Sequence, residues 1–204
     1  KWAVAGGWFD MDNDGDLDLF VVNYVQWDPA RELACGEKAR TYCHPKHYAP
    51  EPHTLSRHTG DGPFPAGSAE GGLAAHAGMG RGRAFGYVDG DGRVDVVVTR
   101  IGEAPLLLKN SLGAGRHWLG VRLRGTRSNR EGIGALVTVT DGKGRRQWNR
   151  VTTAVGYASA SEAVAHFGLG AEGAVSEVEV RWPSGVVQRL GATRGDRYLE
   201  IVEP

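Results

Sequence analysis

The sequence lacks an excess of charge of either sign, a long apolar run and more than one pair of cysteines. Lysine plus arginine total 24 and aspartate plus glutamate total 24, so the net charge at pH 7 is zero. A chain without net charge has no global field to attract nucleic acid or an anionic membrane, so we expect no nucleic-acid partner. No apolar run approaches the roughly 20 residues that cross a bilayer, so we expect no membrane span.

The chain also lacks an initiator methionine and a signal peptide, since it begins at Lys1. We therefore expect it to be the interior or the mature part of a longer protein. Its two cysteines, Cys35 and Cys43, match no zinc motif and no haem-attachment motif. They form either a disulfide or two free thiols, and an oxidising compartment would favour the disulfide.

Glycine is abundant, with 31 residues scattered without a period between short apolar runs. Several segments alternate apolar and polar residues with period two, which is typical of strands, and none shows the 3.6-residue stripe of a helix. The sequence therefore predicts an all-β protein. Three tryptophans in strand-like runs are expected to pack in a core rather than to form a sugar-stacking platform: Trp118, Trp148 and Trp182.

The most informative segment has the spacing D-x-D-x-D-G-x-x-D near the N-terminus. Calcium takes six to eight oxygen ligands, and a tight loop delivers every second side chain to one ion. Without a cation, so many neighbouring carboxylates would repel one another. An EF-hand is disfavoured, because its twelfth position holds Val21 in place of glutamate, and the other alternative is a solvated acidic turn. The predicted Ca²⁺ ligands are Asp10, Asp12, Asp14, Asp16 (through its carbonyl) and Asp18.

A second, altered copy of this loop precedes another valine-rich strand. Asp89, Asp91 and Asp95 align with the later ligand positions, but Tyr87 stands at the first position and Arg93 lies within the loop. The copy indicates an internal repeat and a degenerate second metal loop, for which we expect weak binding or none.

Two other groups of polar residues have a competing functional interpretation. His44, His47 and His53 could form a transition-metal site, but exposed loop polarity is the preferred interpretation. Ser159 and Ser161 lack the Gly-x-Ser-x-Gly pattern of a nucleophile elbow, so they are predicted to be turn or strand residues.

Segments of the chain resemble two known families. The segment WFDMDNDGDLDLFVVN at residues 8–23, RHTGDGPF at 57–64 and the second loop resemble the FG-GAP (VCBS) repeats of integrin-type propellers. The segment from HWLGV at 117–121 to GTRSNREGIGA at 125–135, with HFGLG at 166–170 and VRWPSG at 180–185, resembles the ASPIC/UnbV domain. Together they match the arrangement of the cartilage acidic protein (CRTAC)-like family.

This resemblance implies partial FG-GAP-type propeller blades followed by a small antiparallel β-sandwich or barrel. The expected division is a repeat region at residues 1–112, with a cysteine-bearing insertion at about 27–75, and an ASPIC/UnbV-like sandwich at 113–204. Two repeats cannot close a propeller ring, so either further blades precede Lys1 or the chain is a reduced relative.

The resemblance also implies a function. We expect a non-catalytic, secreted or cell-surface calcium-binding protein of adhesion or scaffold type, extracellular or periplasmic, with an unidentified protein or glycan partner. A structural subunit that forms a homo-oligomer or filament through open sheet edges is an alternative. A polysaccharide-acting enzyme is a second alternative, although nearly all clustered aspartates fall in calcium spacing and leave no spare acid–base pair.

Overall fold

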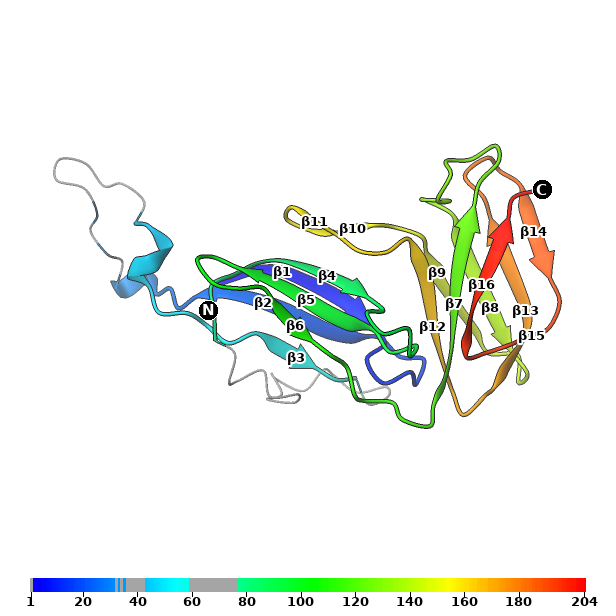
Figure 1. Cartoon of the computed structure of the whole chain (residues 1–204), viewed down its shortest axis with the longest axis horizontal. Coiled ribbons are helices and arrows are strands. Elements are labelled where there is room, and N and C mark those ends of the chain that lie inside the picture. The colour runs from blue at the N-terminus through cyan, green and yellow to red at the C-terminus, as the bar shows by residue number, and fades with distance from the viewer. Residues whose placement is uncertain (1, 32, 34, 36–42, 59–76) are drawn as a thin grey trace.

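The computed structural model describes residues 2–31, 33, 35, 43–58 and 77–204. These residues form β-strands, two short 3-10 helices and no α-helix, so the all-β prediction is confirmed. The strands are arranged in an elongated molecule with the N-terminal strands at one end and the C-terminal strands at the other (Figure 1). No helix of the described residues is long and apolar enough to cross a membrane.

The N-terminal part contains two three-stranded antiparallel sheets of the same design. One has the order β1-β2-β3 and the other β4-β5-β6. Phe9 pairs with Asp18 in the first sheet and Gly86 pairs with Asp95 in the second, so both acidic loops connect equivalent strands. The strands are β1 (Trp2–Phe9), β2 (Asp18–Val25), β3 (Thr54–Ser56), β4 (Gly80–Gly86), β5 (Asp95–Arg100) and β6 (Leu106–Leu108).

These two sheets share one hydrophobic core. Phe20 and Val22 of β2 are buried against Val96 and Val98 of β5, as the alternation along both strands predicts. The described residues form neither a closed barrel nor a propeller, so the assignment of these sheets to propeller blades stays a prediction.

The segment predicted as a cysteine-bearing insertion at about 27–75 contains one strand that the sequence interpretation missed. β3 lies within it and pairs with β2 through Phe20 and Leu55. Three residues are too short a run for alternation to be visible. The connection before β3 carries the helices η1 (Pro29–Arg31) and η2 (Pro45–His47), and residues 59–76 lie outside the described part.

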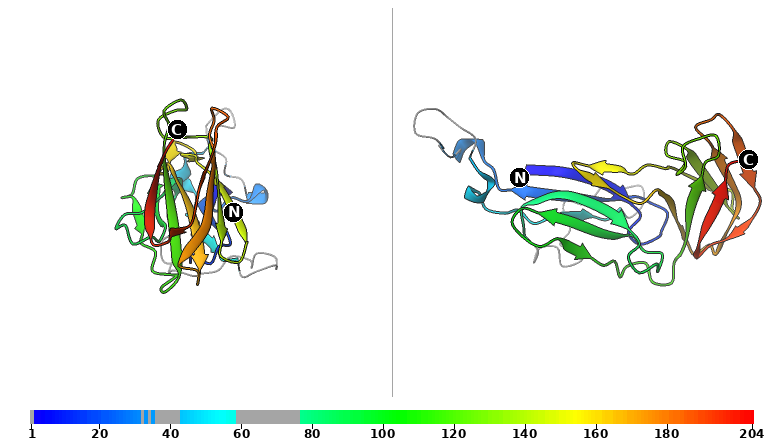
Figure 2. Two further views of the ribbon diagram at one scale, coloured as in Figure 1. Left: turned by 90° about the vertical axis from the view of Figure 1, so that its right-hand side faces the viewer. Right: turned by 45° about the horizontal axis from the view of Figure 1, so that its top comes forward.

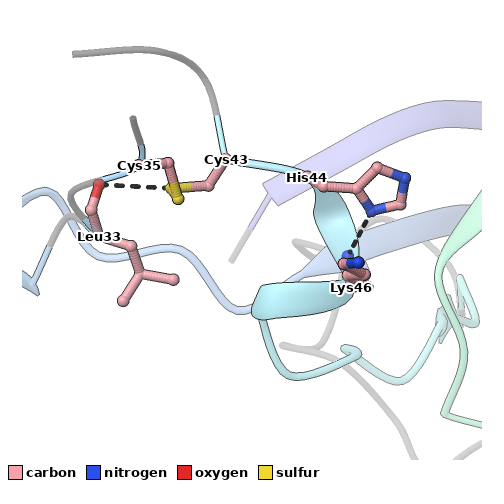
Figure 3. The surroundings of a disulfide bond; sticks show 5 residues. All are labelled: Leu33, Cys35, Cys43, His44 and Lys46. Atoms are coloured by element: carbon pink, nitrogen blue, oxygen red, sulfur yellow. Dashed lines mark hydrogen bonds between the residues drawn. A yellow bond between two sulfur atoms is a disulfide. The ribbon is translucent and has the colours of Figure 1, made fainter. Parts of the chain in front are cut away.

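Cys35 and Cys43 form a disulfide in this connection, which settles the choice left open by the sequence (Figure 3). The carbonyl oxygen of Leu33 lies 3.4 Å from Cys43 Sγ. Because a disulfide sulfur carries no hydrogen, this approach is a contact and not a hydrogen bond. The disulfide closes a short loop beside η2, where Lys46 N–H donates to His44 Nδ1.

The C-terminal part is a sandwich of two sheets around a second core. The smaller sheet has the order β12-β7-β16 and the larger β14-β13-β8-β9, with β15 paired to β13. Leu119, Val137, Val178 and Ile201 are among the buried residues between them. The strands are β7 (His117–Arg124), β8 (Leu136–Asp141), β9 (Arg146–Arg150), β12 (Val164–Gly170), β13 (Ala174–Arg181), β14 (Val187–Leu190), β15 (Thr193–Arg194) and β16 (Arg197–Val202).

One pairing in this sandwich departs from the expected antiparallel pattern. β16 runs parallel to β7, with Leu199 opposite Val121. Alternation of apolar residues gives the buried face of a strand but not its direction, so the sequence could not reveal a parallel neighbour.

A hairpin of β10 (Ala154–Gly156) and β11 (Ser159–Ala160) leaves the sandwich and lies along β1 and β4 of the N-terminal part (Figures 1 and 2). Arg83 N–H donates to Ser159 Oγ at 3.0 Å, and Phe85 N–H donates to Ser161 Oγ at 2.8 Å. Both serines therefore satisfy backbone groups of β4, and Ser159 lies in a strand as the sequence predicts.

Candidate metal centre

The first acidic loop connects β1 to β2 and folds back on itself. Gly15 has φ +92° and Asn13 has φ 59°, both in the left-handed region that glycine and asparagine tolerate best. These turns bring the start and the end of the loop together. As a result Asp10, Asp12 and Asp18 are all buried, with exposed fractions of 6%, 3% and 1%.

Asp10, Asp12 and Asp18 form a compact triad. Each offers a carboxylate oxygen, and these three oxygens all lie within 4.8 Å of one another. Two oxygens bound to one Ca²⁺ at about 2.3–2.6 Å cannot be more than about 5 Å apart, so the triad satisfies this limit. Within the part of the chain that the structure describes, no other three acidic, histidine or cysteine side chains meet this closely.

The other two predicted ligands lie outside the triad. Asp14 is half-buried, and its Oδ1 accepts the N–H of Asp16 at 2.9 Å. The Asp16 carboxylate is 47% exposed and lies 3.9 Å from His58 Nδ1. The structure thus brings three of the five predicted residues together as side chains.

Backbone N–H groups hold two of the triad carboxylates in place. Asp10 accepts from Asp14 N–H at 3.1 Å and from Gly15 N–H at 2.8 Å. Asp18 accepts from Met11 N–H and from His58 N–H, both at 2.7 Å. Each carboxylate oxygen keeps a further lone pair, so these bonds orient the carboxylates without exhausting their capacity for a cation.

Burial in this loop opposes ionisation. Burial raises the pKa of Asp10 to about 7, the hydrogen bond from Gly15 opposes this rise, and the neighbouring carboxylates add to it. Burial likewise raises the pKa of Asp18 to about 6, against hydrogen bonds from His58 and Met11. The triad therefore disfavours its own negative charge and would gain from a bound cation.

Asp12 has charged neighbours but no well-formed hydrogen bond. Its side chain pairs with the guanidinium of Arg57, and Arg116 Nη1 lies 2.6 Å from its Oδ1. Even so, neither buried carboxylate oxygen has a hydrogen-bond partner of acceptable angle. Burial and the carboxylate of Asp14 raise the pKa of Asp12, while Arg57 and Arg116 oppose that rise. The two oxygens of Asp12 therefore have charged partners but no hydrogen bond of acceptable geometry.

The C-terminal sandwich covers the loop, which the sequence did not reveal. Gly170 N–H donates to the carbonyl of Asn13 at 2.8 Å, and His166 Nε2 lies 2.9 Å from Asn13 Oδ1. Gly168 lies so close that a Cβ there would collide with the Asp10 carboxylate. Burial lowers the pKa of His166 to about 4, so the ring adds no positive charge beside the triad at neutral pH.

The second loop repeats the hydrogen bonds of the first. Val88 N–H donates to Asp95 Oδ2 at 3.0 Å and Asn110 N–H to Oδ1 at 2.8 Å, as Met11 and His58 do for Asp18. Its carboxylates, however, have cationic partners. Asp91 pairs with Arg93, and Lys109 Nζ lies 2.5 Å from Asp89 Oδ2.

Tyr87, at the first ligand position of the second loop, joins a cluster of rings between the two parts of the chain. Its centroid lies 5.4 Å from that of His166 and 5.6 Å from that of Tyr198. Trp118 lies 5.0 Å from Tyr198 in an edge-to-face arrangement. The altered residue therefore packs against the sandwich.

The histidines of the long connection do not gather around a common point. His44 Nδ1 accepts Lys46 N–H, and His53 is buried with its Nδ1 3.3 Å from the backbone nitrogen of Asn23. The metal-binding alternative for this group, which includes His47, thus gains no support from the described residues.

Residues 125–204 match the family model described as "ASPIC and UnbV". The C-terminal part contains an ASPIC/UnbV domain. The triad lies outside the matched residues, whereas Gly168 and His166, which cover it, lie inside the ASPIC/UnbV domain.

The whole chain is similar to cartilage acidic protein 1. It is 30% identical over 201 residues to the human and mouse proteins and 28% identical to that of Xenopus tropicalis, and each alignment covers 96% of this chain. The same alignments cover only 27–28% of the relatives, so the chain spans little more than a quarter of their length.

Proposed function

We propose that this chain is a non-catalytic, calcium-stabilised interaction module of an extracellular protein. The observation that carries the proposal is the triad of Asp10, Asp12 and Asp18, which is buried, internally repulsive and incompletely hydrogen-bonded. A Ca²⁺ ion would supply the positive charge that these carboxylates need in order to remain ionised.

Asp10, Asp12 and Asp18 would hold this ion through side-chain oxygens. Asp14 lies near enough to Asp12 to influence its pKa and is a candidate for a fourth ligand. The backbone carbonyl oxygen of Asp16 would be a further ligand of the ion. Backbone N–H groups from Gly15, Met11 and His58 would keep the carboxylates oriented in the bound state.

The position of the loop gives the ion a structural role. Asn13 is buried between Gly92 of the second loop and Gly170 of the sandwich, and it forms hydrogen bonds with both. Asn110 also donates to the Met11 carbonyl at 2.7 Å. An ion that orders this loop would therefore order the junction of both repeats with the ASPIC/UnbV domain.

We propose that the second loop does not depend on Ca²⁺. Arg93 and Lys109 bring positive charge to Asp91 and Asp89, which is the charge that an ion would otherwise supply. Arg93 Nε also donates to the Asn110 carbonyl at 3.0 Å. With Tyr87 in place of the first carboxylate, the second loop would be closed by side chains alone.

The extracellular location rests on two observations. One is the disulfide between Cys35 and Cys43, a bond that persists mainly in oxidising compartments. The other is the similarity to cartilage acidic protein 1, which extends over nearly the whole chain.

Hydrogen exchange followed by mass spectrometry tests the proposed role of the ion. Ca²⁺ should slow exchange of the amides of Asp14 and Gly15, which bond to Asp10, relative to exchange in EGTA. Exchange of the amides of Arg127 and Ser128, which bond to Glu203 in the sandwich and not to the acidic loops, should remain unchanged. Equal exchange in both conditions at the first loop would remove the ion from the proposal.

The alternative of a structural subunit retains one supporting observation. β3 and β6 are edge strands of their sheets within the described residues, and unpaired edges can recruit another chain. Light scattering after size-exclusion chromatography separates the two possibilities. A monomer at high protein concentration would count against the polymer, and concentration-dependent growth would favour it.

A further inference from the structure

Trp148 lies on the outer face of the larger sheet of the sandwich and contradicts the expectation that it packs in a core. Its side chain is 71% exposed, whereas Trp118 and Trp182 are buried as predicted. Strand β9 alternates exposed and half-buried residues, and Trp148 falls on the exposed side. A tryptophan indole this open to solvent, held on a strand, presents a large rigid surface for a ligand.

Arginines flank Trp148 on the same face of β9. Arg146 and Arg150 are two residues away on either side, so their side chains leave the sheet in the same direction. The two positions are about 13 Å apart along the strand, at roughly 3.3 Å per residue. Arg146 forms no ion pair with any described residue, and Arg150 donates one hydrogen bond, to the Gly134 carbonyl.

The neighbouring strands extend this positive face. Thr138 is paired with Trp148, and Glu179 of β13 is paired with Thr138, so these three residues form one row across the sheet. Glu179 is already neutralised, because both Arg181 and Arg189 form ion pairs with it. The face therefore retains uncompensated positive charge at Arg146 and Arg150.

Trp148 stands between two hollows. One, of about 440 Å³, is lined by Leu136, Thr138 and Glu179 together with Arg146 and Arg150. The other, of about 520 Å³, lies on the far side of β9 and is lined in part by the exposed Trp8 and Leu17. Both hollows are open to solvent, so an extended ligand can lie along them beside the indole.

Two side chains of β9 join this strand to β12 of the smaller sheet. Gln147 Nε2 donates to the Gly168 carbonyl at 2.9 Å and Asn149 Nδ2 donates to the His166 carbonyl at 3.2 Å, so side chains tie this edge to β12. The groups that this face offers to a ligand are the indole of Trp148 and the guanidinium groups of Arg146 and Arg150.

We propose that Trp148, Arg146 and Arg150 bind an anionic polysaccharide. The apolar face of a sugar ring can stack on the indole, while each planar guanidinium can take a carboxylate or sulfate group bidentately. The repeating charge of such a polymer matches two arginines held at a fixed spacing on one strand. Trp148, Arg146 and Arg150 are not members of the acidic triad, although Asp10 lines part of the 520 Å³ hollow. The proposal does not rest on the proposed calcium function.

Affinity electrophoresis of the whole chain tests the proposal. Native gels are cast with heparin as the sulfated probe, polygalacturonic acid as the carboxylated probe and dextran as the neutral control. At least one anionic polymer should retard the chain and dextran should not. Trp148→Ala, and separately the double variant R146Q/R150Q, should each weaken the apparent affinity about tenfold or more, as is typical of central tryptophan and arginine contacts.

The matched control is Arg197→Gln, which removes the same charge from an exposed position on the opposite sheet. It should change the affinity less than twofold. The proposal is wrong if neither anionic polymer retards the chain, if R197Q weakens retention as much as R146Q/R150Q, or if W148A leaves retention unchanged. Trp148-dependent retention by poly-glutamate or oligo-thymidine, as tight as that by the polysaccharides, would also overturn it.

Discussion

The prediction that follows most directly from the triad concerns thermal stability with and without Ca²⁺. In the ion-free chain, Arg57 and Arg116 offset the charge of Asp12, which leaves the pair of Asp10 and Asp18 uncompensated. Two charges within 4.8 Å of one another repel by about 3.5 kcal/mol or more at an effective dielectric constant of 20. Because a bound ion would relieve this repulsion, it can raise the free energy of unfolding by a similar amount.

The linkage between binding and folding gives a stabilisation of similar size. A ligand at 100 times its Kd stabilises the folded state by about 2.7 kcal/mol. For a chain of this length, about 3 kcal/mol corresponds to a rise in Tm of about 6–12 °C. The assay is differential scanning fluorimetry in 10 mM CaCl₂ and in EGTA at pH 8, where Asp10, with a pKa of about 7, is mostly ionised.

Asp12→Asn should abolish most of this calcium-dependent rise, because it removes a ligand of the triad. Asp16→Asn removes the same charge from the same loop but at a side chain outside the triad, so it should retain most of the rise. An identical Tm in CaCl₂ and EGTA for the unaltered chain would refute the reasoning. So would an equal response of the two variants.

Three further predictions concern the surroundings of the triad and the C-terminus. Arg116→Gln should strengthen Ca²⁺ binding about fivefold, as measured by calorimetry. The half-exposed guanidinium 2.6 Å from Asp12 competes with the ion for this carboxylate, and its removal should favour ion binding by about 1 kcal/mol. Unchanged or weaker binding would contradict this. Gly168→Ala should lower the free energy of unfolding by about 2 kcal/mol, as measured by urea denaturation, because the added Cβ would collide with the Asp10 carboxylate. A change below about 0.5 kcal/mol would contradict this, because it would mean that the loop can move to accommodate the methyl group. Burial alone would raise the pKa of Glu203, but hydrogen bonds from Ser128, Ser184 and Arg127 lower it to about 2. The contribution of the ionised Glu203 carboxylate to the free energy of unfolding is therefore complete above pH 4.5 and is lost as the pH falls towards 2. Glu203→Gln should destabilise the chain at pH 7 and make its stability depend less on pH in the acid range. Parallel curves of stability against pH for the two proteins would refute this.

Local chemistry made much of the fold and part of the site predictable. Alternation identified β7, β8, β13 and β16 because the alternating apolar residues of each strand are buried, as Leu119 and Val121 show. The spacing of the acidic loop predicted where β2 begins, at Asp18, and which residues converge. These features depend only on neighbours in the sequence.

Features that depend on distant partners were missed. The close approach of Gly168 to Asp10 and the ion pairs of Asp12 with Arg57 and Arg116 join segments far apart in the chain. The exposure of Trp148 was missed for a related reason. Trp148 is the single apolar residue of its strand, so no alternation marks its face, and the covering sheet decides which face is buried.

The most direct test of the central claim is isothermal titration calorimetry of the EGTA-stripped chain with CaCl₂. The account predicts saturable binding of one ion per chain, at the triad of Asp10, Asp12 and Asp18, and no second site at the loop neutralised by Arg93 and Lys109. The absence of saturable heat, or a stoichiometry of two, would contradict it.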